Sequence, residues 1–453
     1  MRIILDIPIL LSEAVSAIGS KMNEKRCDRQ IYAICTDSRE CELYDLFFSL
    51  ASLKEDRLKN ADDAASRGAI CICDVGDYIL VPDTGAALLR LSAFYKSKLP
   101  RLLHTVGITG SIGKSTCKRF VADVLSGAYR VSGTIGNFNN RIGISLSILS
   151  ASRDTEVLVL EMGMNHSGEI LEMSKEIRPD ICVITNVGTA HIGNLGSREA
   201  IRDAKCEIIS DAAVAVIVPS NESLLDNVEH RVGVSLSDMA DAKRDESANT
   251  TLLHGDNGYT LFVYGKKICD IHPKSTLRRD LYALLIAGVT ATVLGMEKVD
   301  IEYALNNTVN DRAERRIISL GDITLIDDTY NSSPEAVEYM LEYLSDFPSP
   351  RFAVLSDMLE LGDMAKELHY RIGGQASCLD GLYVIGEYAD IVARGAIDGG
   401  MVENSVRRLS SEAPEKAADL LMREVKRGTI LLKGSHATGL SGVVKILCER
   451  MKK

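Results

Sequence analysis

The sequence Gly107-Ile-Thr-Gly-Ser-Ile-Gly-Lys-Ser-Thr116 decides the fold of the middle of this 453-residue chain. It follows the apolar run Leu102 to Ile108, which predicts a strand, and it precedes the helical pattern Lys118 to Leu125. A strand, a glycine turn and a helix in this order direct backbone N–H groups and a positive helix end at one point, where a polyphosphate can bind. Lys114 adds a positive charge, and the hydroxyl of Ser115 suits Mg²⁺.

The match is to a shortened form of the phosphate loop. The full pattern asks for glycine at the position of Ile108, so the chain keeps Thr-Gly-x-x-Gly-Lys-Ser only. A Gly-Lys-Ser triplet by itself also fits the plain start of a helix. The strand before the triplet and the helix after it favour the phosphate site.

The composition limits the location and the partners of the protein. Apolar residues make up 46% of the chain and charged residues 25%, and no run of about 18 apolar residues predicts a membrane span. The first residues carry an acid before any cleavage site, so we expect no signal peptide and a cytoplasmic protein. A net charge of −11 without a basic block argues against nucleic acid. The 11 cysteines form no CxxC pair, so we expect free thiols and no zinc.

The alternation of strands and helices predicts an α/β protein with three domains. Residues 1–82 form a small α/β domain, which ends where Pro82-Asp83-Thr84 can cap a helix. Residues 83–312 form a central, doubly wound ATPase domain around the phosphate loop, with a hairpin at Gly255-Asp-Asn-Gly258. Residues 313–453 form a Rossmann-like domain. The strands expected in the last two domains include Glu156 to Glu161, Ile181 to Val187, Ala213 to Val218, Ile323 to Ile326, Phe352 to Leu355, Leu382 to Ile385 and Thr429 to Leu432.

Polar side chains follow two neighbouring strands of the central domain. Glu161 ends one strand, and Asn186 and His191 follow the next. Ligands of an open α/β sheet bind at the carboxyl ends of its strands. A carboxylate, an amide and an imidazole together suit a hard divalent cation held between protein and phosphates. Each residue alone is also compatible with a polar position in solvent.

Lys205 shares one helical face with Ile201 and Ile208. A lysine on an apolar face usually extends its amine to water. An amine that is buried instead must lose its proton or gain a partner. Capture of CO₂ as a carbamate would turn it into an anionic metal ligand. The pattern alone favours the amine that reaches water.

The third domain places polar residues after its strands as well. In Asp327-Asp-Thr-Tyr-Asn-Ser-Ser-Pro334, acid and amide side chains could contact a ribose or orient a phosphate, while Ser333 followed by Pro334 is typical of a helix start. Both interpretations can hold together. The segments Ser356-Asp-Met-Leu-Glu-Leu-Gly362 and Lys433-Gly-Ser435 follow two further strands, so these polar groups are expected to face one cleft.

Together these segments resemble the Mur ligases, most closely the MurF type, over nearly the whole chain. The segments that carry the resemblance are Thr36-Asp-Ser-Arg39, Gly136-Asn-Phe-Asn-Asn140, Glu161-Met-Gly163, Asp327 to Pro334, Asp357-Met-Leu-Glu-Leu-Gly362 and Lys433-Gly-Ser435. The resemblance implies a ligase of peptidoglycan precursor synthesis that uses ATP and Mg²⁺. ATP would phosphorylate the carboxylate of a UDP-N-acetylmuramoyl tripeptide, and the amine of D-alanyl-D-alanine would attack the acyl phosphate. The partners would be these small molecules, and we expect a monomer.

The resemblance also assigns roles to residues. Lys114, His191 and Lys205 would be catalytic, Lys205 as a carbamylated lysine. Metal ligands would be Ser115, Glu161, His191 and Lys205. The ATP site would comprise Gly110, Ser111, Gly113, Lys114, Ser115, Thr116, Asp280, Arg312, Asp328 and Asn331. The other substrates would bind Ser38, Arg39, Asn137, Asn139, Asn140, Asp357 and Ser435.

The chain departs from the family pattern at several places. Arg279-Asp280 replaces a His-Asn pair, so an amide that donates and accepts becomes an acceptor only. Ser52-Leu-Lys-Glu-Asp56 replaces the Gly-Glu and Asp-Gly-His pieces of the first domain, Ser115 replaces threonine, and His436 replaces arginine. Two alternatives therefore stay open: a diverged Mur-type ligase that joins another amino compound to another carboxylate, and an inactive nucleotide-binding scaffold.

Overall fold

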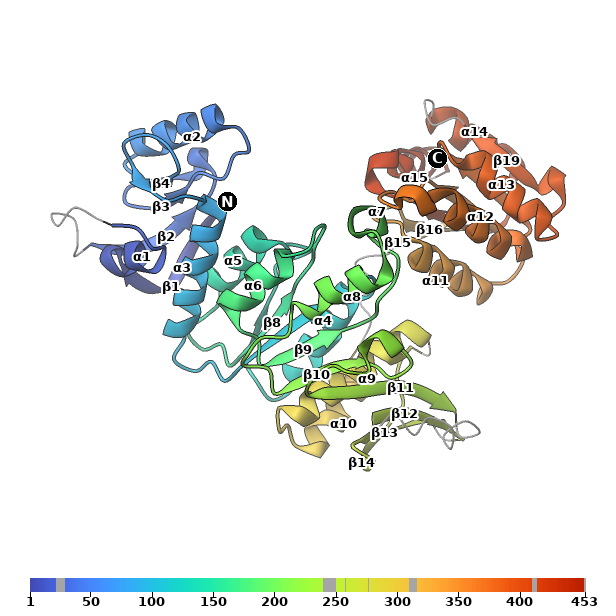
Figure 1. The fold of residues 1–453 in the computed structure, drawn as a ribbon. Coiled ribbons are helices and arrows are strands. Elements are labelled where there is room, and N and C mark those ends of the chain that lie inside the picture. The colour runs from blue at the N-terminus through green and yellow to red at the C-terminus, as the bar shows by residue number, and fades with distance from the viewer. Residues whose placement is uncertain are drawn as a thin grey trace. The chain divides into compact units, whose positions relative to one another are not determined.

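The structure, a computed structural model, describes residues 1–21, 29–238, 250–256, 258–275, 277–308, 316–409 and 414–451. The chain forms two compact units. The first comprises Met1–Val187 and Arg202–Val309, and the second comprises Gly188–Ile201 and Asn310–Lys453 (Figure 1). Three sheets with helices between their strands confirm the predicted α/β class. The predicted boundaries at residues 82 and 312 stay predictions.

The first sheet has five strands in chain order, β1-β2-β3-β4-β5. The β1–β2 pair is antiparallel and the remaining pairs are parallel. Its middle strand is fully buried, with Phe47 and Phe48 in the core. The strands are β1 (Arg2–Leu10), β2 (Gln30–Cys35), β3 (Leu46–Phe48), β4 (Ile70–Cys73) and β5 (Ile79–Leu80), and the helices are α1 (Leu11–Ala17), the 3₁₀ turn Ser38–Glu40 and α2 (Lys54–Ser66).

Helix α3 (Thr84–Lys98) connects the first sheet to the second. Asp83 caps it by accepting the Ala86 N–H at 2.9 Å, as the sequence predicted. Tyr95 is fully buried on this helix, and its hydroxyl accepts the Ile7 N–H and donates to the Ala151 carbonyl. One phenol therefore bonds both to β1 and to the loop that follows α5 (Arg141–Leu149).

The second sheet has nine strands in the order β14-β13-β12-β11-β10-β9-β6-β8-β7. Strand β6 pairs in parallel with β8 on one side and β9 on the other, so the loop that leaves β6 has a strand end on each side. The strands are β6 (His104–Thr109), β7 (Val131–Gly133), β8 (Val157–Glu161), β9 (Ile181–Ile184), β10 (Ala215–Pro219), β11 (Arg231–Asp238), β12 (Thr250–Gly255), β13 (Gly258–Val263) and β14 (Lys266–Ile271). The helices are α4 (Lys114–Leu125), α5, α6 (Glu169–Ile177), α8 (Arg198–Cys206), α9 (Arg278–Val293) and α10 (Lys298–Asn307), with a 3₁₀ turn at Ser223–Leu225.

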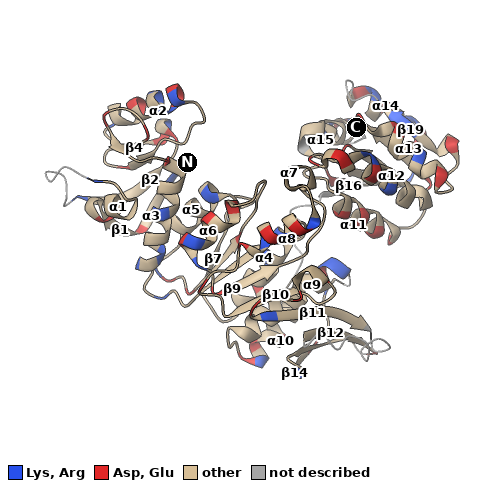
Figure 2. Ribbon diagram, in the orientation of Figure 1, with Lys and Arg blue, Asp and Glu red and all other residues tan. Residues whose placement is uncertain are grey.

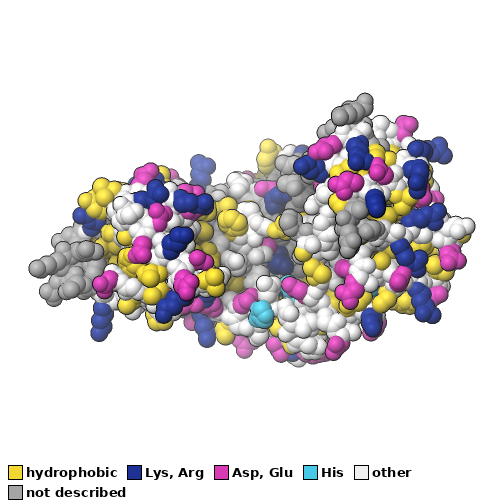
Figure 3. Space-filling view, turned by 90° about the horizontal axis from the view of Figure 1, so that it is seen from above, with side chains coloured by type: hydrophobic (Ala, Val, Ile, Leu, Met, Phe, Trp, Pro, Cys, Tyr) yellow, Lys and Arg dark blue, Asp and Glu magenta, His cyan; other side chains and the backbone are white. Residues whose placement is uncertain are grey.

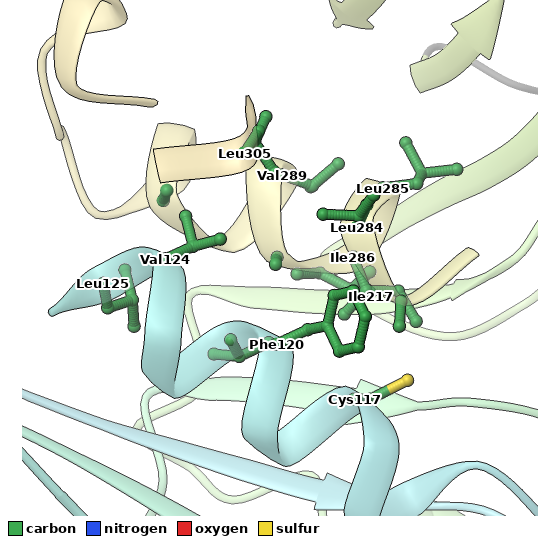
Figure 4. Close-up of a cluster of buried hydrophobic side chains, with 14 of the residues drawn as sticks. Cys117, Phe120, Val124, Leu125, Ile217, Leu284, Leu285, Ile286, Val289 and Leu305 are labelled. Carbon is green, nitrogen blue, oxygen red and sulfur yellow. The ribbon is translucent and has the colours of Figure 1, made fainter. Parts of the chain in front are cut away.

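Helix α4, which follows the phosphate loop, is fixed by a large apolar core. Phe120 and Val124 of α4 belong to the same buried cluster as Leu284 and Ile286 of α9 (Figure 4). Both residues of α4 are at most 1% exposed. Burying such side chains stabilises the fold by about 1.5–3 kcal/mol each. The core therefore gives the helix, and the loop in front of it, a rigid base.

The third sheet lies in the second unit and has the order β15-β16-β20-β17-β18-β19. The β15–β16 pair is antiparallel and the others are parallel. The strands are β15 (Arg316–Leu320), β16 (Ile323–Asp328), β17 (Arg351–Ser356), β18 (Gly381–Ile385), β19 (Val406–Leu409) and β20 (Gly428–Lys433). The helices are α7 (Ile192–Leu195), α11 (Pro334–Ser345), α12 (Ala365–Gln375), α13 (Ala389–Asp398), α14 (Pro414–Glu424) and α15 (Leu440–Met451), with 3₁₀ turns at Gly362–Met364, Ala376–Cys378, Glu403–Ser405 and His436–Thr438.

The predicted hairpin is confirmed, because β12 and β13 pair from Thr251–Phe262 to Gly255–Gly258. All the strands expected in the last two domains are present, with ends shifted by up to three residues. No described helix is both long and apolar enough to cross a membrane. Charged residues of both signs occur on α12 and α13 (Figure 2), and charged side chains of both signs mix over the face seen in Figure 3.

Candidate functional site

The phosphate loop begins at a glycine that a larger residue would distort. A Cβ atom on Gly110 would lie 1.8 Å from Oγ1 of Thr185. This same hydroxyl donates to the carbonyl of Ile112 at 2.6 Å. The side chain that would collide with a Cβ therefore also holds the loop in shape, so the loop needs glycine here.

Asn186 braces the same loop from the end of β9. Its Oδ1 accepts the N–H groups of Ser111 and Ile112, both at 3.0 Å, and its Nδ2 donates to the Ile112 carbonyl at 3.0 Å. The sequence placed Asn186 among oxygen ligands for a cation. The structure shows that interpretation to be wrong in detail, because the amide oxygen already accepts two backbone N–H groups and the residue acts as a brace.

The start of helix α4 is open to a ligand. Gly113 is its N-cap residue, with a left-handed φ of 81°, and a Cβ atom there would meet nothing within 4 Å. No side chain of the described residues caps this helix. The N–H groups of the first turn, which contains Ser115 and the buried Thr116, have no partner inside the helix. An anion such as a phosphate would satisfy them and would face the positive helix end.

Lys114 folds back over the loop. Its Nζ donates to the carbonyls of Gly110 at 2.7 Å and Ser111 at 3.2 Å. Burial lowers the pKa of Lys114, and the nearby Glu161 opposes this shift. A bound phosphate would give this half-buried ammonium an anionic partner.

Glu161 is a buried carboxylate beside the loop. It is 1% exposed at the end of β8, and its Oε1 accepts from Nδ2 of Asn139 at 2.9 Å. Its Oε2 has no hydrogen-bond partner among the described residues and lies 3.4 Å from Nζ of Lys118. The ammonium of Lys118 balances part of the charge of this carboxylate, but a buried oxygen that accepts no hydrogen bond still carries a cost. A divalent cation would offset this cost, so the residue present fits a metal ligand.

Asn139 and Asn140, both assigned to the substrate, make hydrogen bonds that support the fold. Asn139 holds Glu161, and a Cβ atom on Gly163 would lie 2.7 Å from the Asn139 side chain. Asn140 caps α5 by accepting the Gly143 N–H at 2.9 Å. Asn137 is exposed. Their roles toward a substrate stay predictions.

Lys205 does not reach water. It is 1% exposed, and Ile201 and Ile208 on the same helical face are fully buried. The interpretation that the sequence pattern favoured by itself is therefore wrong. The carbamate that the resemblance implies stays a prediction.

Asp280, which stands where the family pattern has an asparagine, is buried. Asp280 is 1% exposed in the first turn of α9, and its Oδ2 accepts from the Ser275 hydroxyl at 2.6 Å. Arg312, the predicted partner of ATP, lies outside the described residues.

The residues expected to bind the nucleotide-sugar lie on the 3₁₀ turn Ser38–Glu40, between β2 and β3. Asp37 accepts from the N–H and the guanidinium of Arg39, and these bonds hold the pKa of Asp37 well below its usual value. Ser38 is buried and Arg39 is exposed. Arg57 holds the start of the stretch Ser52 to Asp56, which departs from the family pattern. Its guanidinium donates to the carbonyls of Ala51 and Ser52 at 3.0 and 2.8 Å.

In the second unit, Asp328 and Lys433 pair at the ends of β16 and β20. Their charged atoms lie 3.5 Å apart, and Lys433, which is 2% exposed, also donates to the Asn331 carbonyl. Ser435 follows and is buried. The predicted helix start is confirmed, because Ser333 caps α11 and Pro334 is its first residue. A buried ammonium thus ties together two of the predicted ATP contacts.

Asp357, in the loop after β17, holds the loop that follows β18. Its carboxylate accepts the N–H groups of Glu387 at 2.7 Å and Tyr388 at 3.0 Å. Both oxygens therefore fix the start of α13, which is a structural use of a residue predicted to bind a substrate. Its contact with a substrate stays a prediction.

The structure brings together the phosphate loop, Glu161 and Asn139 in the first unit. His191 belongs to the second unit, where its Nδ1 pairs with Glu360, so its convergence with Glu161 and Lys205 stays a prediction. Sequence reasoning missed Lys118 and Glu360. The spacing of Lys118 from Lys114, one helical turn, could have indicated the former.

Comparison with protein families gives two matches. The family described as Mur ligase middle domain matches residues 108–287, which include the phosphate loop. The family described as Mur ligase, glutamate ligase domain matches residues 312–436.

Individual relatives extend the similarity to the whole chain. A UDP-N-acetylmuramoyl-tripeptide--D-alanyl-D-alanine ligase from Synechocystis is 31% identical, over 93% of this chain and 92% of the relative. The crystal structure of MurF ligase from Thermotoga maritima in complex with ADP has a TM-score of 0.75 and 26% identity, over 92% of this chain and 97% of that one. A MurF structure from Acinetobacter baumannii has a TM-score of 0.84 at 24% identity, over 100% of both chains, and shows the shared fold.

Proposed function

The chain belongs to the Mur ligase family, and from this premise we propose that it is an ATP-dependent ligase joining D-alanyl-D-alanine to a UDP-N-acetylmuramoyl tripeptide. One observation carries the proposal. The uncapped start of α4 and Lys114 lie beside Glu161, a buried carboxylate with an oxygen that lacks a donor. This arrangement suits transfer of a phosphoryl group from a nucleotide.

The obstacle to the reaction is the repulsion between two anions, the acceptor carboxylate and the polyphosphate. Lys114 and the N–H groups of α4 oppose this repulsion with positive charge. A carboxylate oxygen of the tripeptide attacks the γ-phosphorus, the bond to the bridging oxygen breaks, and ADP leaves. The amine of the dipeptide then attacks the carbonyl carbon of the acyl phosphate. Phosphate leaves with the electrons of the broken C–O bond, and the amine gives up a proton.

Mg²⁺ is the second cofactor in this proposal. Ser115 would hold one Mg²⁺, and Glu161 and His191 would serve a second metal site, with a carbamylated Lys205 as a further metal ligand. The fit rests on the oxygen of Glu161 that has no hydrogen-bond donor among the described residues and on the burial of Lys205. Bound there, the cation would supply charge that stabilises phosphate oxygens. A carbamate would present oxygen to the cation, whereas an ammonium would repel it.

The nucleotide-sugar end of the substrate would lie against the first sheet, at Ser38 and Arg39. The exposed guanidinium of Arg39, held in place by Asp37, can pair with an anionic oxygen of the diphosphate. The stretch Ser52 to Asp56, which stands in place of the family's Gly-Glu and Asp-Gly-His pieces, contacts Arg57 through the carbonyl of Ser52. This departure favours the second candidate, a Mur-type ligase with a different carboxylate substrate. We also propose that the protein is monomeric and cytoplasmic.

Phosphate release tests the proposal. The purified protein is supplied with ATP, Mg²⁺, the UDP-N-acetylmuramoyl tripeptide and D-alanyl-D-alanine. We expect phosphate release only when ATP, Mg²⁺ and both substrates are present. The product should exceed the mass of the tripeptide substrate by the mass of the dipeptide less one water. Release only with another amine or carboxylate would support the second candidate. No release with any pair, despite ATP binding, would support an inactive scaffold.

A further inference from the structure

The segment Gly188–Ile201 is carried by the second unit of the chain. In sequence it lies inside the stretch that matches the Mur ligase middle domain. It contains His191 and the short helix α7 (Ile192–Leu195). Something in the second unit must therefore hold this segment, and the loop after β17 does so.

The first attachment is a close contact of two backbones. The N–H of Gly193 donates to the carbonyl of Glu360 at 2.9 Å. A Cβ atom on Gly193 would lie 2.6 Å from the nitrogen of Gly362, and a Cβ atom on Gly362 would lie 2.8 Å from the Cα of Gly193. The two glycines thus allow an approach that any side chain at either position would prevent.

The second attachment uses side chains. The carboxylate of Glu360 pairs with Nδ1 of His191, and Oε1 of Glu335 accepts the N–H and, at 2.8 Å, the hydroxyl of Thr189. A carboxylate can only accept, so Nδ1 carries the proton of this pair. In a neutral imidazole, Nε2 then bears the lone pair. The side chain of His191 keeps 23% of its surface exposed, so the pairing does not seal the ring.

The loop that presents Glu360 is itself fixed. Glu360 and His191 both have left-handed backbones, with φ of 62° and 66°, which non-glycine residues adopt only when their surroundings hold them there. The N–H of Met358 donates to Nε2 of the buried His369 at 2.9 Å, and Asp357 accepts two N–H groups from the start of α13. These contacts fix the residues just before Glu360 and so aim its side chain at the segment.

We propose that Glu360 is a positioning residue for His191. Its carboxylate selects the tautomer with the proton on Nδ1, which makes Nε2 the nitrogen able to bind a divalent cation, and its carbonyl anchors Gly193. The part concerning the cation rests on the proposed function, whereas the part concerning the tautomer does not. Carboxylates that orient metal-bound histidines commonly change metal affinity by about 10–100-fold when removed.

The tautomer is tested first, without metal or nucleotide. Nitrogen NMR of the full chain labelled at histidine, with His191 assigned by His191→Gln, is compared in wild type, Glu360→Ala and Glu360→Gln. We expect the Nδ1–H form in wild type, a shift towards Nε2–H in Glu360→Ala, and retention in Glu360→Gln, whose amide oxygen still accepts. Glu342→Ala, an exposed glutamate of α11, is the matched control and should match wild type. An unchanged tautomer in Glu360→Ala would overturn the proposal.

The cation is tested by kinetics. At saturating substrates, Glu360→Ala should raise the Mg²⁺ concentration for half activity by about 10–100-fold. KM for the tripeptide substrate should not change, and Glu360→Gln should recover most of the loss. A fall in kcat with an unchanged Mg²⁺ requirement would overturn the role toward the cation. If wild type shows no ligase activity, the proposed function fails, and the tautomer result still decides the role of Glu360.

Discussion

Replacing Asn186 with alanine should loosen the phosphate loop and leave the rest of the fold intact. The side chain makes three hydrogen bonds of 3.0 Å to the backbone of Ser111 and Ile112. At about 0.5–1.5 kcal/mol each, their loss amounts to roughly 1.5–4.5 kcal/mol. Thr185 still holds the Ile112 carbonyl, so the loop is not released completely. We therefore expect a net effect near the lower half of this range, about 2 kcal/mol.

The loop must then be ordered when the nucleotide binds, and this cost appears as weaker affinity. About 2 kcal/mol corresponds to about a 30-fold rise in the dissociation constant of ADP, measured by titration calorimetry. Binding of the tripeptide substrate and the circular dichroism spectrum should stay as in wild type. Asn307→Ala, which removes an exposed asparagine of α10, is the control. ADP affinity equal to that of wild type would refute the bracing role of Asn186.

Three further results are expected. Lys114→Ala should abolish ADP formation with an unchanged melting temperature, because the cation at the phosphate loop is lost and the core is kept; normal turnover would contradict its role. Lys205→Ala should be inactive and partly recover with added short carboxylates, measured as phosphate release, and an active variant would exclude a carbamate. Burial lowers the pKa of His369, so below about pH 6.5 the unfolded chain binds a proton that the folded chain resists. The free energy of unfolding should therefore decrease as the pH is lowered, by at most about 1.4 kcal/mol per pH unit. In His369→Gln, thermal melting measured from pH 7 to pH 5 should show a smaller decrease. An equal decrease in wild type and variant would contradict this reasoning.

The sequence was sufficient where one local pattern determines one structure. The order strand, glycine turn and helix specified the phosphate loop, and the apolar positions of α4 specified the face that packs on α9. Caps were predictable as well, since Asp83 and Ser333 stand directly before their helices. Edge strands such as β15 and β19 were missed because their partly exposed residues give no continuous apolar run.

The contacts that aim side chains depend on residues distant in the chain. The brace from Asn186 to the phosphate loop joins residues about 75 positions apart, and the pair of His191 with Glu360 spans 169. Neither the periodicity nor the spacing of a single sequence contains this information. The burial of Lys205 was misjudged for a related reason, because a lysine on an apolar helical face usually has water within reach and here does not.

The transfer of an oxygen atom tests the central claim most directly. The tripeptide substrate is labelled with ¹⁸O in the carboxylate that accepts the dipeptide, and the released phosphate is analysed by mass spectrometry. Activation of that carboxylate by the nucleotide held at Gly107 to Thr116 predicts one ¹⁸O atom in each phosphate. Phosphate without the label, formed together with the amide product, would contradict the account.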